Sequence, residues 1–401
     1  MTTAPEPSSQ TETRPLRKRM RMMLGAAFAA ALALPMLGTI FHWDPAPSYE
    51  NRAMALMPGW PHGFAEARVF ADRFMSYYRD NFGFRNTMIR AVALGEYHGG
   101  VGLQNNANVL IGKQGWLYLP LGDENFLAFR GLNPMSEGEL EQWRRLLESR
   151  RGWCRSRGIQ FVVVIPPDKQ TIYPEHLPDQ FARRFGESRL DQLIGYLQKQ
   201  NSPVDLVDLR RALFSAKRER QIYYTTDSHW NNFGAYVGYR ALIAEVQKVL
   251  PGREIPVPGL DQFSAATVTY VGDLAKDLDL YYEYQEQATM LTPRGGFTYF
   301  TAMVDKKERD YADGPDRAAP RMVMYSDSFA AALIPYLAAS FSHAYFRWGD
   351  SNDLAIAQRE KADVVIDEFV ERKLCGPPPV DGPGESNPIE KWTEVTVSRH
   401  R

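Results

Sequence analysis

The longest apolar stretch of the chain lies near its N-terminus. No residue between Met22 and Phe41 is charged, which makes an uninterrupted run of 20 residues. A helix rises about 1.5 Å per residue, so this run is just long enough to cross a hydrocarbon core of roughly 30 Å. The pattern therefore predicts a transmembrane helix over residues 22–41.

The charges around this run predict its orientation. Residues 1–21 end in a basic cluster, which should stay on the cytoplasmic side of the membrane; it is made of Arg14, Arg17, Lys18, Arg19 and Arg21. We then expect the rest of the chain in the periplasm, held at the inner membrane by a single span. The alternative is a cleaved signal peptide with Ala31-Leu32-Ala33 as its cleavage site. Because the apolar run continues to Phe41, the uncleaved anchor is favoured.

Beyond the apolar run, the pattern indicates a linker and then one large domain. Residues 42–60 contain several prolines and are expected to link the membrane segment to a domain over 61–375. At the start of this domain, residues 63–96 carry apolar side chains at helical spacing, with an interruption at 81–85. Residues 109–119 then predict a β-hairpin.

From residue 136 onward, helical and strand patterns alternate. The continuous apolar run 160–165 is typical of a strand buried on both faces of a parallel sheet, and the alternation predicts a layered α/β fold. Residues 251–320 are expected to form an insertion, and residues 376–401 a loose tail rich in Pro and Gly. Helices are predicted over 136–157, 187–200, 232–249 and 329–339, and strands over 160–165, 204–209, 321–325, 343–347 and 362–366.

Composition and cysteine content restrict the function less than the pattern does. The formal net charge is -1, so the chain lacks the basic excess that is usual in nucleic-acid-binding proteins. Cys154 and Cys375 are the two cysteines. They could pair in an oxidising compartment or remain separate thiols, and the sequence leaves both possibilities open.

A candidate nucleophile follows the predicted strand at 321–325. Ser328 lies in a short polar turn between that strand and an apolar helix. The unpaired backbone N–H groups at a helix N-terminus can stabilise the oxyanion that forms when a serine attacks an ester. The alternative is that Ser326, Asp327 or Ser328 only caps the helix.

A candidate base precedes the predicted helix 232–249. His229 is of a residue type that titrates near neutral pH, so it can take the proton of a serine hydroxyl. Asp227 can hold the second ring nitrogen if the loop turns both side chains the same way. The alternative is a structural histidine with Asp227 as a helix cap. No pair of histidines has zinc-motif spacing, so the sequence predicts no metal site. A Gly-rich phosphate loop is also absent from the sequence.

Taken in order, several segments resemble the alginate O-acetyltransferases of the AlgJ and AlgX type, which carry an SGNH-hydrolase-like domain. The similarity spans residues 48–375, and the common order of its segments makes it specific. It implies a three-layer α/β/α fold in which the catalytic blocks have a permuted order, Asp and His before Ser. The segments are Asn51-Arg52, Tyr78–Arg85, Gly112–Tyr118, Pro166–Lys169, Tyr173-Pro174, Asp227–Trp230, Gly272–Leu274 and Ser326–Phe329.

The resemblance implies a role for each block. Ser328 corresponds to the nucleophile, His229 to the base, and Asp227 to the residue that orients the base. The family usually has Gly where this chain has Ser326. A positive φ at that position would strain a serine.

The resemblance also implies the reaction, which is transfer of acetyl groups to hydroxyls of an exopolysaccharide, alginate-like or other. No cofactor is expected, because in such systems a membrane-bound O-acyltransferase delivers the acetyl group. Trp230, Asn231 and Lys169 are candidates for seating the sugar; their alternatives are core packing, helix capping and a surface charge. The rival functions are an acetyl esterase with the same triad and a non-catalytic protein that binds polysaccharide or scaffolds the acetylation machinery.

Overall fold

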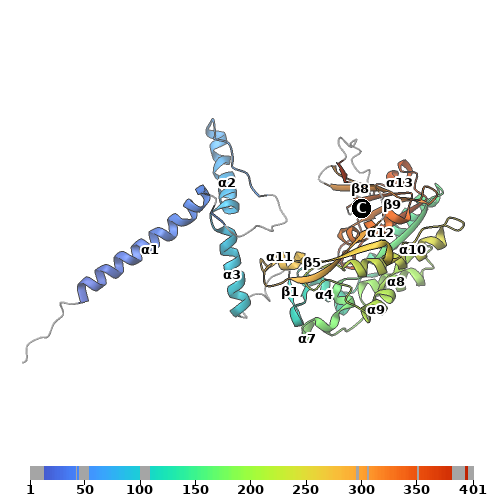
Figure 1. Ribbon diagram of the computed structural model, residues 1–401, viewed down its shortest axis with the longest axis horizontal. Helices are drawn as coiled ribbons and strands as arrows, with labels where there is room; N and C mark the ends of the chain where they lie inside the picture. The colour runs from blue at the N-terminus through green and yellow to red at the C-terminus, as the bar shows by residue number, and fades with distance from the viewer. Residues whose placement is uncertain are drawn as a thin grey trace, which may run out of the picture. The chain divides into compact units, whose positions relative to one another are not determined.

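The computed structural model describes residues 13–41, 43–44, 54–99, 109–294, 298–304, 307–349, 352–381 and 393–395 (Figure 1). The chain separates into two compact units, Met1–Gly102 and Leu103–Arg401. The second unit therefore begins at residue 103, whereas the sequence suggested a domain start at residue 61.

Within its described residues, the first unit is helical, with α1 (Thr13–Phe41), α2 (Phe64–Asn81) and α3 (Arg85–Gly99). Residues Arg19–Phe41 of α1 are long and apolar enough to cross a membrane, and no other helix of the described ranges meets that criterion. A signal sequence has the same features. The anchor expected over residues 22–41 therefore stays a prediction.

Hydrogen bonds inside the first unit explain why α2 and α3 group with the N-terminal segment. The turn between them contacts α1, where the Gly83 amide donates to the Thr39 hydroxyl at 2.8 Å. A Cβ atom on Gly83 would lie 2.4 Å from the Cα of Gly38, so this approach requires glycine. At the start of α3, the Asp44 carboxylate accepts from the Asn86 amide at 2.7 Å. The apolar spacing of residues 63–96 does not reveal these polar contacts, which is why the sequence boundary differs.

The second unit alternates strands and helices as the sequence predicted. Its first half contains β1 (Leu110–Ile111), β2 (Leu117–Tyr118), α4 (Glu124–Arg130), α5 (Glu137–Arg155), β3 (Gln160–Ile165), α6 (Lys169–Ile172), α7 (Asp179–Ala182), α8 (Arg189–Lys199), β4 (Asp205–Asp208), α9 (Arg210–Lys217) and α10 (Asn232–Val249). Its second half contains β5 (Phe263–Tyr270), α11 (Asp273–Asp277), β6 (Glu286–Pro293), β7 (Thr298–Val304), β8 (Lys307–Asp313), β9 (Arg321–Ser326), α12 (Ile334–Ser340), β10 (His343–Trp348), α13 (Ala355–Arg359), β11 (Val364–Glu368) and β12 (Thr393–Val395). Short 3₁₀ turns include η5 (Ser328–Ala332) and η6 (Glu371–Cys375).

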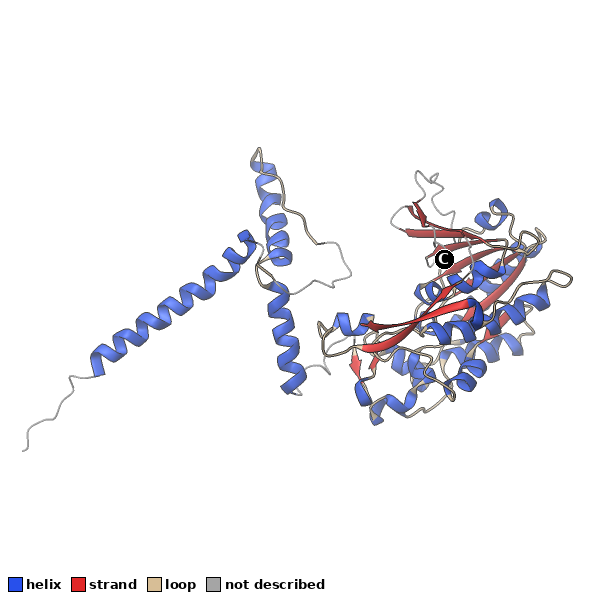
Figure 2. Ribbon diagram, viewed as in Figure 1, coloured by secondary structure: helices blue, strands red, loops and turns tan. Residues whose placement is uncertain are grey.

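Strands of the second unit, drawn in red in Figure 2, lie among its helices. They include an eight-stranded sheet with the order β12-β7-β8-β10-β9-β11-β3-β4. Strands β10, β9, β11, β3 and β4 are parallel. Strands β8, β7 and β12 continue the sheet in antiparallel pairings. The carboxyl ends of the parallel strands thus meet at one edge, where open α/β sheets usually bind ligands.

Alternate side chains of the parallel strands pack into two separate apolar clusters. In β3, Val162 and Val164 belong to one cluster, whereas Val163 and Ile165 belong to the other. The first cluster contains side chains of α9, α10 and α12, and the second contains side chains of α5, α8 and α13. The sheet is buried on both faces between two helical layers, which confirms the expected three-layer α/β/α class.

Capping residues define where the longer helices begin. The Ser136 side chain accepts from the Glu139 amide, and the Glu139 carboxylate accepts from the Ser136 amide, which closes a capping box at the start of α5. Ser188 and Asp191 form the same arrangement at the start of α8. These local signals explain why the sequence placed both helices within two residues of their observed bounds.

The segment 251–320, expected as an insertion, contributes to the architecture of the domain. β7 and β8 lie within it and extend the central sheet from β10. β5 and β6 pair with each other in a separate antiparallel ribbon. Long-range strand pairing of this kind carries no short sequence signal, which is why the segment looked irregular.

The C-terminal residues also differ from the loose tail that composition suggested. Asp381 accepts two hydrogen bonds from the buried guanidinium of Arg150, at 2.6 and 3.1 Å, and β12 pairs with β7. A buried cation requires carboxylate partners, and this requirement holds part of the tail in place. Cys154 and Cys375 are both free thiols.

Candidate active site

The structure brings Ser328, His229 and Asp227 into one hydrogen-bonded chain. The Nε2 atom of His229 lies 2.7 Å from Oγ of Ser328, and its Nδ1 atom lies 2.7 Å from Oδ1 of Asp227. Ser328 and His229 are partly exposed, whereas Asp227 is buried. This is the geometry of a nucleophile, a base and an orienting acid.

The turn that carries Ser328 is shaped by the residue before it. Asp327 caps η5, because its carboxylate accepts from the Phe329 amide at 2.9 Å, and it also accepts from the Val370 amide at 2.8 Å. The capping interpretation therefore holds for Asp327, and the hydroxyl of Ser328 remains available to His229. Ser326 ends β9 without a positive φ, so the serine is unstrained at this position.

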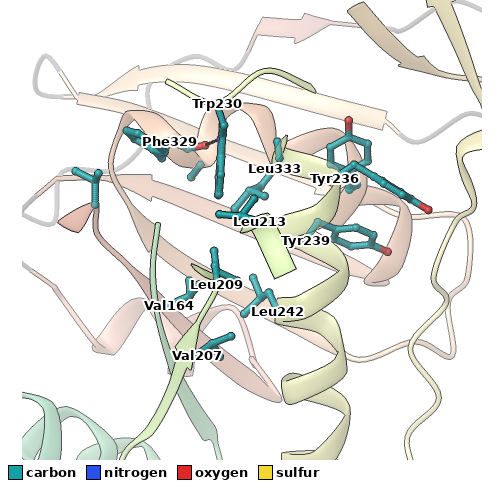
Figure 3. Close-up of a cluster of buried hydrophobic side chains, with 14 of the residues drawn as sticks. Val164, Val207, Leu209, Leu213, Trp230, Tyr236, Tyr239, Leu242, Phe329 and Leu333 are labelled. Atoms are coloured by element: carbon teal, nitrogen blue, oxygen red, sulfur yellow. Dashed lines mark hydrogen bonds between the residues drawn. The ribbon is translucent and has the colours of Figure 1, made fainter. Parts of the chain in front are cut away.

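Two aromatic rings support this turn from inside the domain. The indole Nε1 of Trp230 donates to the carbonyl oxygen of Phe329 at 3.1 Å, and the two rings meet edge to face (Figure 3). The Phe329 ring also lies 4.8 Å from the His229 ring, measured between centroids. Both aromatic side chains are buried. They therefore pack the end of β9, His229 and Ser328 into one rigid unit.

Asp227 accepts more hydrogen bonds than the one from the imidazole. Its carboxylate also accepts from the His229 amide at 2.9 Å, the Tyr270 hydroxyl at 2.6 Å and the Asp273 amide at 3.0 Å. Burial alone would raise the pKa of Asp227, but these donors and the charge of His229 lower that pKa below its ordinary value. Asp227 is therefore a carboxylate, and His229 directs its Nδ1 proton at it.

Residues from the 251–320 segment hold the loop that carries Asp227. Glu286 on β6 accepts from the backbone amides of Thr225 and Thr226 at 3.0 and 2.8 Å. The amide of Gly272, directly before α11, donates to the Thr226 hydroxyl at 3.0 Å. Among these residues the sequence singled out only the block that begins at Gly272, and it gave that block no role. Tyr270 and Glu286 carried no signal, because their partners lie more than 40 residues away.

Each of the three residues expected to seat the sugar makes a structural contact within the domain. Trp230 is buried under the nucleophile turn. Asn231 is the N-cap of α10, where its side chain accepts from the Phe233 and Gly234 amides. Core packing and helix capping, which were the alternatives for these two positions, therefore describe them.

Lys169 is buried and not a surface charge. Its ammonium donates to the carbonyl oxygens of Leu117 at 2.6 Å and Thr225 at 3.1 Å. Burial lowers the pKa of Lys169 to about 8, although the charges of Asp227, Asp273 and Glu286 oppose this change. Lys169 thus connects the β1–β2 hairpin to the loop that carries Asp227, because its ammonium donates to a backbone carbonyl in each.

A second group of buried charges lies behind the site. The Arg372 guanidinium donates to the Asp168 carboxylate and lies 5.1 Å from the centroid of the Phe329 ring. Glu371 accepts from the Thr171 hydroxyl at 2.6 Å and the Asp168 amide at 2.9 Å. Burial, together with the charge of Asp168, raises the pKa of Glu371 to about 7.

A cavity of about 450 Å³ lies at the carboxyl ends of β9 and β11. Its lining includes Ser326 and Asp327, the two residues before Ser328. Trp143 and Glu368 on its wall are buried, whereas Leu121 at its rim is exposed. Its volume is in the range of small-ligand sites.

Within the described ranges, one group of side chains has the spacing to hold a metal ion, and it shares Asp227 and His229 with the triad. Ligand atoms of Asp227, His229 and Asp273 lie within 4.8 Å of one another. Hydrogen bonds already use these atoms, because Oδ1 of Asp227 pairs with Nδ1 of His229 and Oδ2 of Asp273 accepts from the Ser228 hydroxyl at 2.6 Å. These hydrogen bonds account for the short distances between the three side chains.

Comparison with known families supports the fold of the second unit. The model of the family described as "SGNH hydrolase-like domain, acetyltransferase AlgX" matches residues 109–326, more than half of the chain. The match begins at the β1–β2 hairpin and includes Asp227 and His229. It ends two residues before Ser328.

Two curated relatives are similar to part of the chain. The probable alginate O-acetylase AlgJ of Pseudomonas syringae pv. tomato is 28% identical over 179 residues, which are 44% of this chain and 43% of that protein. The protein of the same name from Pseudomonas aeruginosa is 26% identical over 178 residues, which are 44% of this chain and 42% of that protein. The chain thus matches less than half of the length of these relatives.

A solved structure shares the fold. PatB1 of Bacillus cereus superposes with a TM-score of 0.51 and 16% identity, covering 67% of this chain and 97% of PatB1. At this identity the likeness concerns the fold alone. It agrees with the three layers seen in the second unit.

Replacing Gly272 by Ala should disrupt the loop of Asp227, because the added Cβ would lie 2.1 Å from the Thr226 carbonyl oxygen. We expect a loss of about 1–3 kcal/mol in the free energy of unfolding and slower labelling of Ser328 by a fluorophosphonate. Gly195→Ala is the matched control, since nothing lies within 4 Å of its Cβ position in α8. Normal stability and labelling of Gly272→Ala would contradict the close approach.

Glu371→Gln should change how stability depends on pH. A carboxyl group whose pKa is raised on folding stabilises the protein below its ordinary pKa of 4.5 and loses that contribution as the pH rises through about 7. The wild type should therefore lose about 2 kcal/mol more than the variant between pH 5 and pH 8. Urea unfolding at both pH values measures this difference, with Glu187→Gln on the surface as control. Equal losses would rule out a raised pKa at Glu371.

Proposed function

The chain belongs to the family of SGNH hydrolase-like acetyltransferases of the AlgX type, and from this premise we propose that it transfers acetyl groups to hydroxyls of an exopolysaccharide. The observation that carries the proposal is the hydrogen-bonded chain from Asp227 through His229 to Ser328. The names of the AlgJ relatives support a polysaccharide acceptor.

The first step of the proposed mechanism acetylates Ser328. His229 takes the proton of the Ser328 hydroxyl with Nε2 while Oγ attacks the carbonyl carbon of the acetyl donor. The developing imidazolium is stabilised by the Asp227 carboxylate. The backbone N–H of Ser328 would hold the oxyanion. When the tetrahedral intermediate collapses, His229 gives the proton to the leaving group.

The second step moves the acetyl group to the sugar. His229 takes the proton of a sugar hydroxyl, whose oxygen attacks the acetyl carbon, and Ser328 leaves as it regains a proton from His229. Transfer instead of hydrolysis requires that the sugar hydroxyl outcompetes water. We assign the acceptor to the neighbourhood of the cavity of about 450 Å³, because Ser326 and Asp327, the two residues before Ser328, line it.

The N-terminal segment supports a location for this reaction. We propose that α1 anchors the chain in the inner membrane and that the second unit acts in the periplasm, with the basic residues before the span remaining in the cytoplasm. Acetyl-CoA is a cytoplasmic metabolite, so a membrane-bound O-acyltransferase partner would supply the acetyl group. No cofactor is then required by the chain itself.

Ser328→Ala should abolish acetyl transfer by the full chain in detergent. Wild type and variant receive p-nitrophenyl acetate and a panel of oligosaccharides, and released acetate and acceptor mass are followed together. We expect acetylated sugar with the wild type and a loss of roughly 10³-fold or more with the variant. Ser264→Ala is the control, because its hydroxyl bonds to a backbone carbonyl on the β5–β6 ribbon.

The other outcomes of this experiment separate the rival functions. Acetate that depends on Ser328, with no sugar acetylated, would favour an acetyl esterase with the same triad. Equal behaviour of wild type and Ser328→Ala would eliminate the triad and favour a non-catalytic scaffold.

Membrane fractions test the anchor. We expect the chain to stay in the membrane pellet after washing with high salt or alkaline carbonate, and to be released by detergent, because an apolar span is not held by charge. A version that starts at residue 42 and carries a cleavable secretion signal should appear in the soluble periplasmic fraction. Release of the full chain by salt alone would contradict a spanning helix.

A further inference from the structure

A second carboxylate lies next to the imidazole of His229. Asp273 begins α11, and its Oδ2 atom lies 3.5 Å from Nδ1 of His229. The Oδ1 atom of Asp227 faces the same nitrogen at 2.7 Å. A catalytic triad needs one carboxylate in this position, so the role of Asp273 requires an explanation of its own.

The carboxylate of Asp273 holds the peptide that joins the acid to the base. It accepts from the amide of Ser228 at 2.7 Å and from the hydroxyl of Ser228 at 2.6 Å. Ser228 is the residue between Asp227 and His229. Fixing both of its donors therefore limits how far the acid and the base can move relative to each other.

The backbone of Asp273 completes the arrangement. Its amide donates to Oδ2 of Asp227 at 3.0 Å, next to the Tyr270 hydroxyl at 2.6 Å. A single residue thus contacts Asp227 through its main chain and Ser228 through its side chain. The contacts form a closed ring that includes His229.

The charges of the three groups are coupled. Burial and the negative charge of Asp227 raise the pKa of Asp273, and the charge of His229 opposes this rise. Two carboxylates in one place repel each other, and a proton on the imidazole between them relieves that repulsion. The same coupling favours the imidazolium that forms during acyl transfer.

We propose that Asp273 is a positioning residue of the triad, which holds the Ser228 peptide so that His229 faces Ser328 and adds a second negative charge next to the imidazolium. The inference rests on the proposed function, because it takes His229 as the base. It gives a role to the Gly272–Leu274 block, where glycine allows α11 to approach the loop and Asp273 makes the contacts.

The test depends on the charged groups around the imidazole. Asp227 faces His229 from its own loop, Asp273 faces it from α11, and the neutral Ser328 hydroxyl faces it from η5. Four further groups act on these carboxylates, namely Tyr270, Lys169, Asp277 and Arg372, and Glu286 acts on Lys169. Asp273→Asn leaves all of them in place and removes one charge with little change in size.

The experiment compares Asp273→Asn with Asp277→Asn in the full chain in detergent. Asp277 lies on the same helix, is exposed, and makes no hydrogen bond to the loop within the described contacts. Rates of acetyl-Ser328 formation are measured with p-nitrophenyl acetate from pH 5 to pH 9. For Asp273→Asn we expect a loss in kcat of roughly 10- to 100-fold with KM unchanged. The low-pH limb should move to lower pH by about half a unit to one unit. Asp277→Asn removes a charge that also acts on both carboxylates but makes none of the contacts with Ser228, so it should move the limb less and leave kcat unchanged.

A second variant tests the contact through Ser228 and guards against misfolding of the first. Ser228→Ala should lower kcat by roughly 3- to 10-fold, and the double variant should lose less than the product of the single losses, since both changes break one network. Independent losses, or a low-pH limb that stays in place in Asp273→Asn, would overturn the inference. Ser328→Ala is measured in parallel. If it retains activity the proposed function fails, whereas its inactivity combined with a normal Asp273→Asn refutes only the role of Asp273.

Discussion

Asp227 places a negative charge inside the second unit, where a carboxylate without partners is strongly disfavoured. Four donors surround it, from two atoms of His229, from Tyr270 and from the Asp273 backbone. Two distant parts of the chain, the loop 227–229 and the segment 270–273, must therefore meet at this carboxylate. This requirement explains why α11 lies so close to the loop that only glycine fits at position 272.

The nucleophile turn shows a related division of labour between neighbouring residues. Asp327 uses its carboxylate to cap η5 and to bind the Val370 amide, so it joins the exits of β9 and β11. Ser328, next in the chain, keeps its hydroxyl for His229. Helix capping and nucleophilic attack are thus functions of adjacent residues, and evidence for one does not argue against the other.

Much of the fold and the centre of the site could be predicted from local patterns. The apolar run 160–165 became β3 with the bounds expected, and alternation of strands and helices predicted the layers. Family resemblance brought Asp227, His229 and Ser328 together before any distance was known. The contacts of Trp230, Asn231 and Lys169 inside the domain could not be read from the sequence. A residue type alone does not tell whether its side chain faces a ligand or the protein interior.

What the sequence determined by itself follows from short-range physics, since apolar periodicity, capping residues and the long uncharged run each act within a few residues. The tertiary structure alone decided which distant groups would meet. Tyr270, Asp273 and Glu286 come from a segment that looked like an irregular insertion, yet they hold the loop of the acid. These side chains form hydrogen bonds with a buried charge and with backbone donors that lie more than 40 residues away in the chain. Buried polar groups need such partners, but hydrogen bonds between distant residues leave no pattern in the sequence.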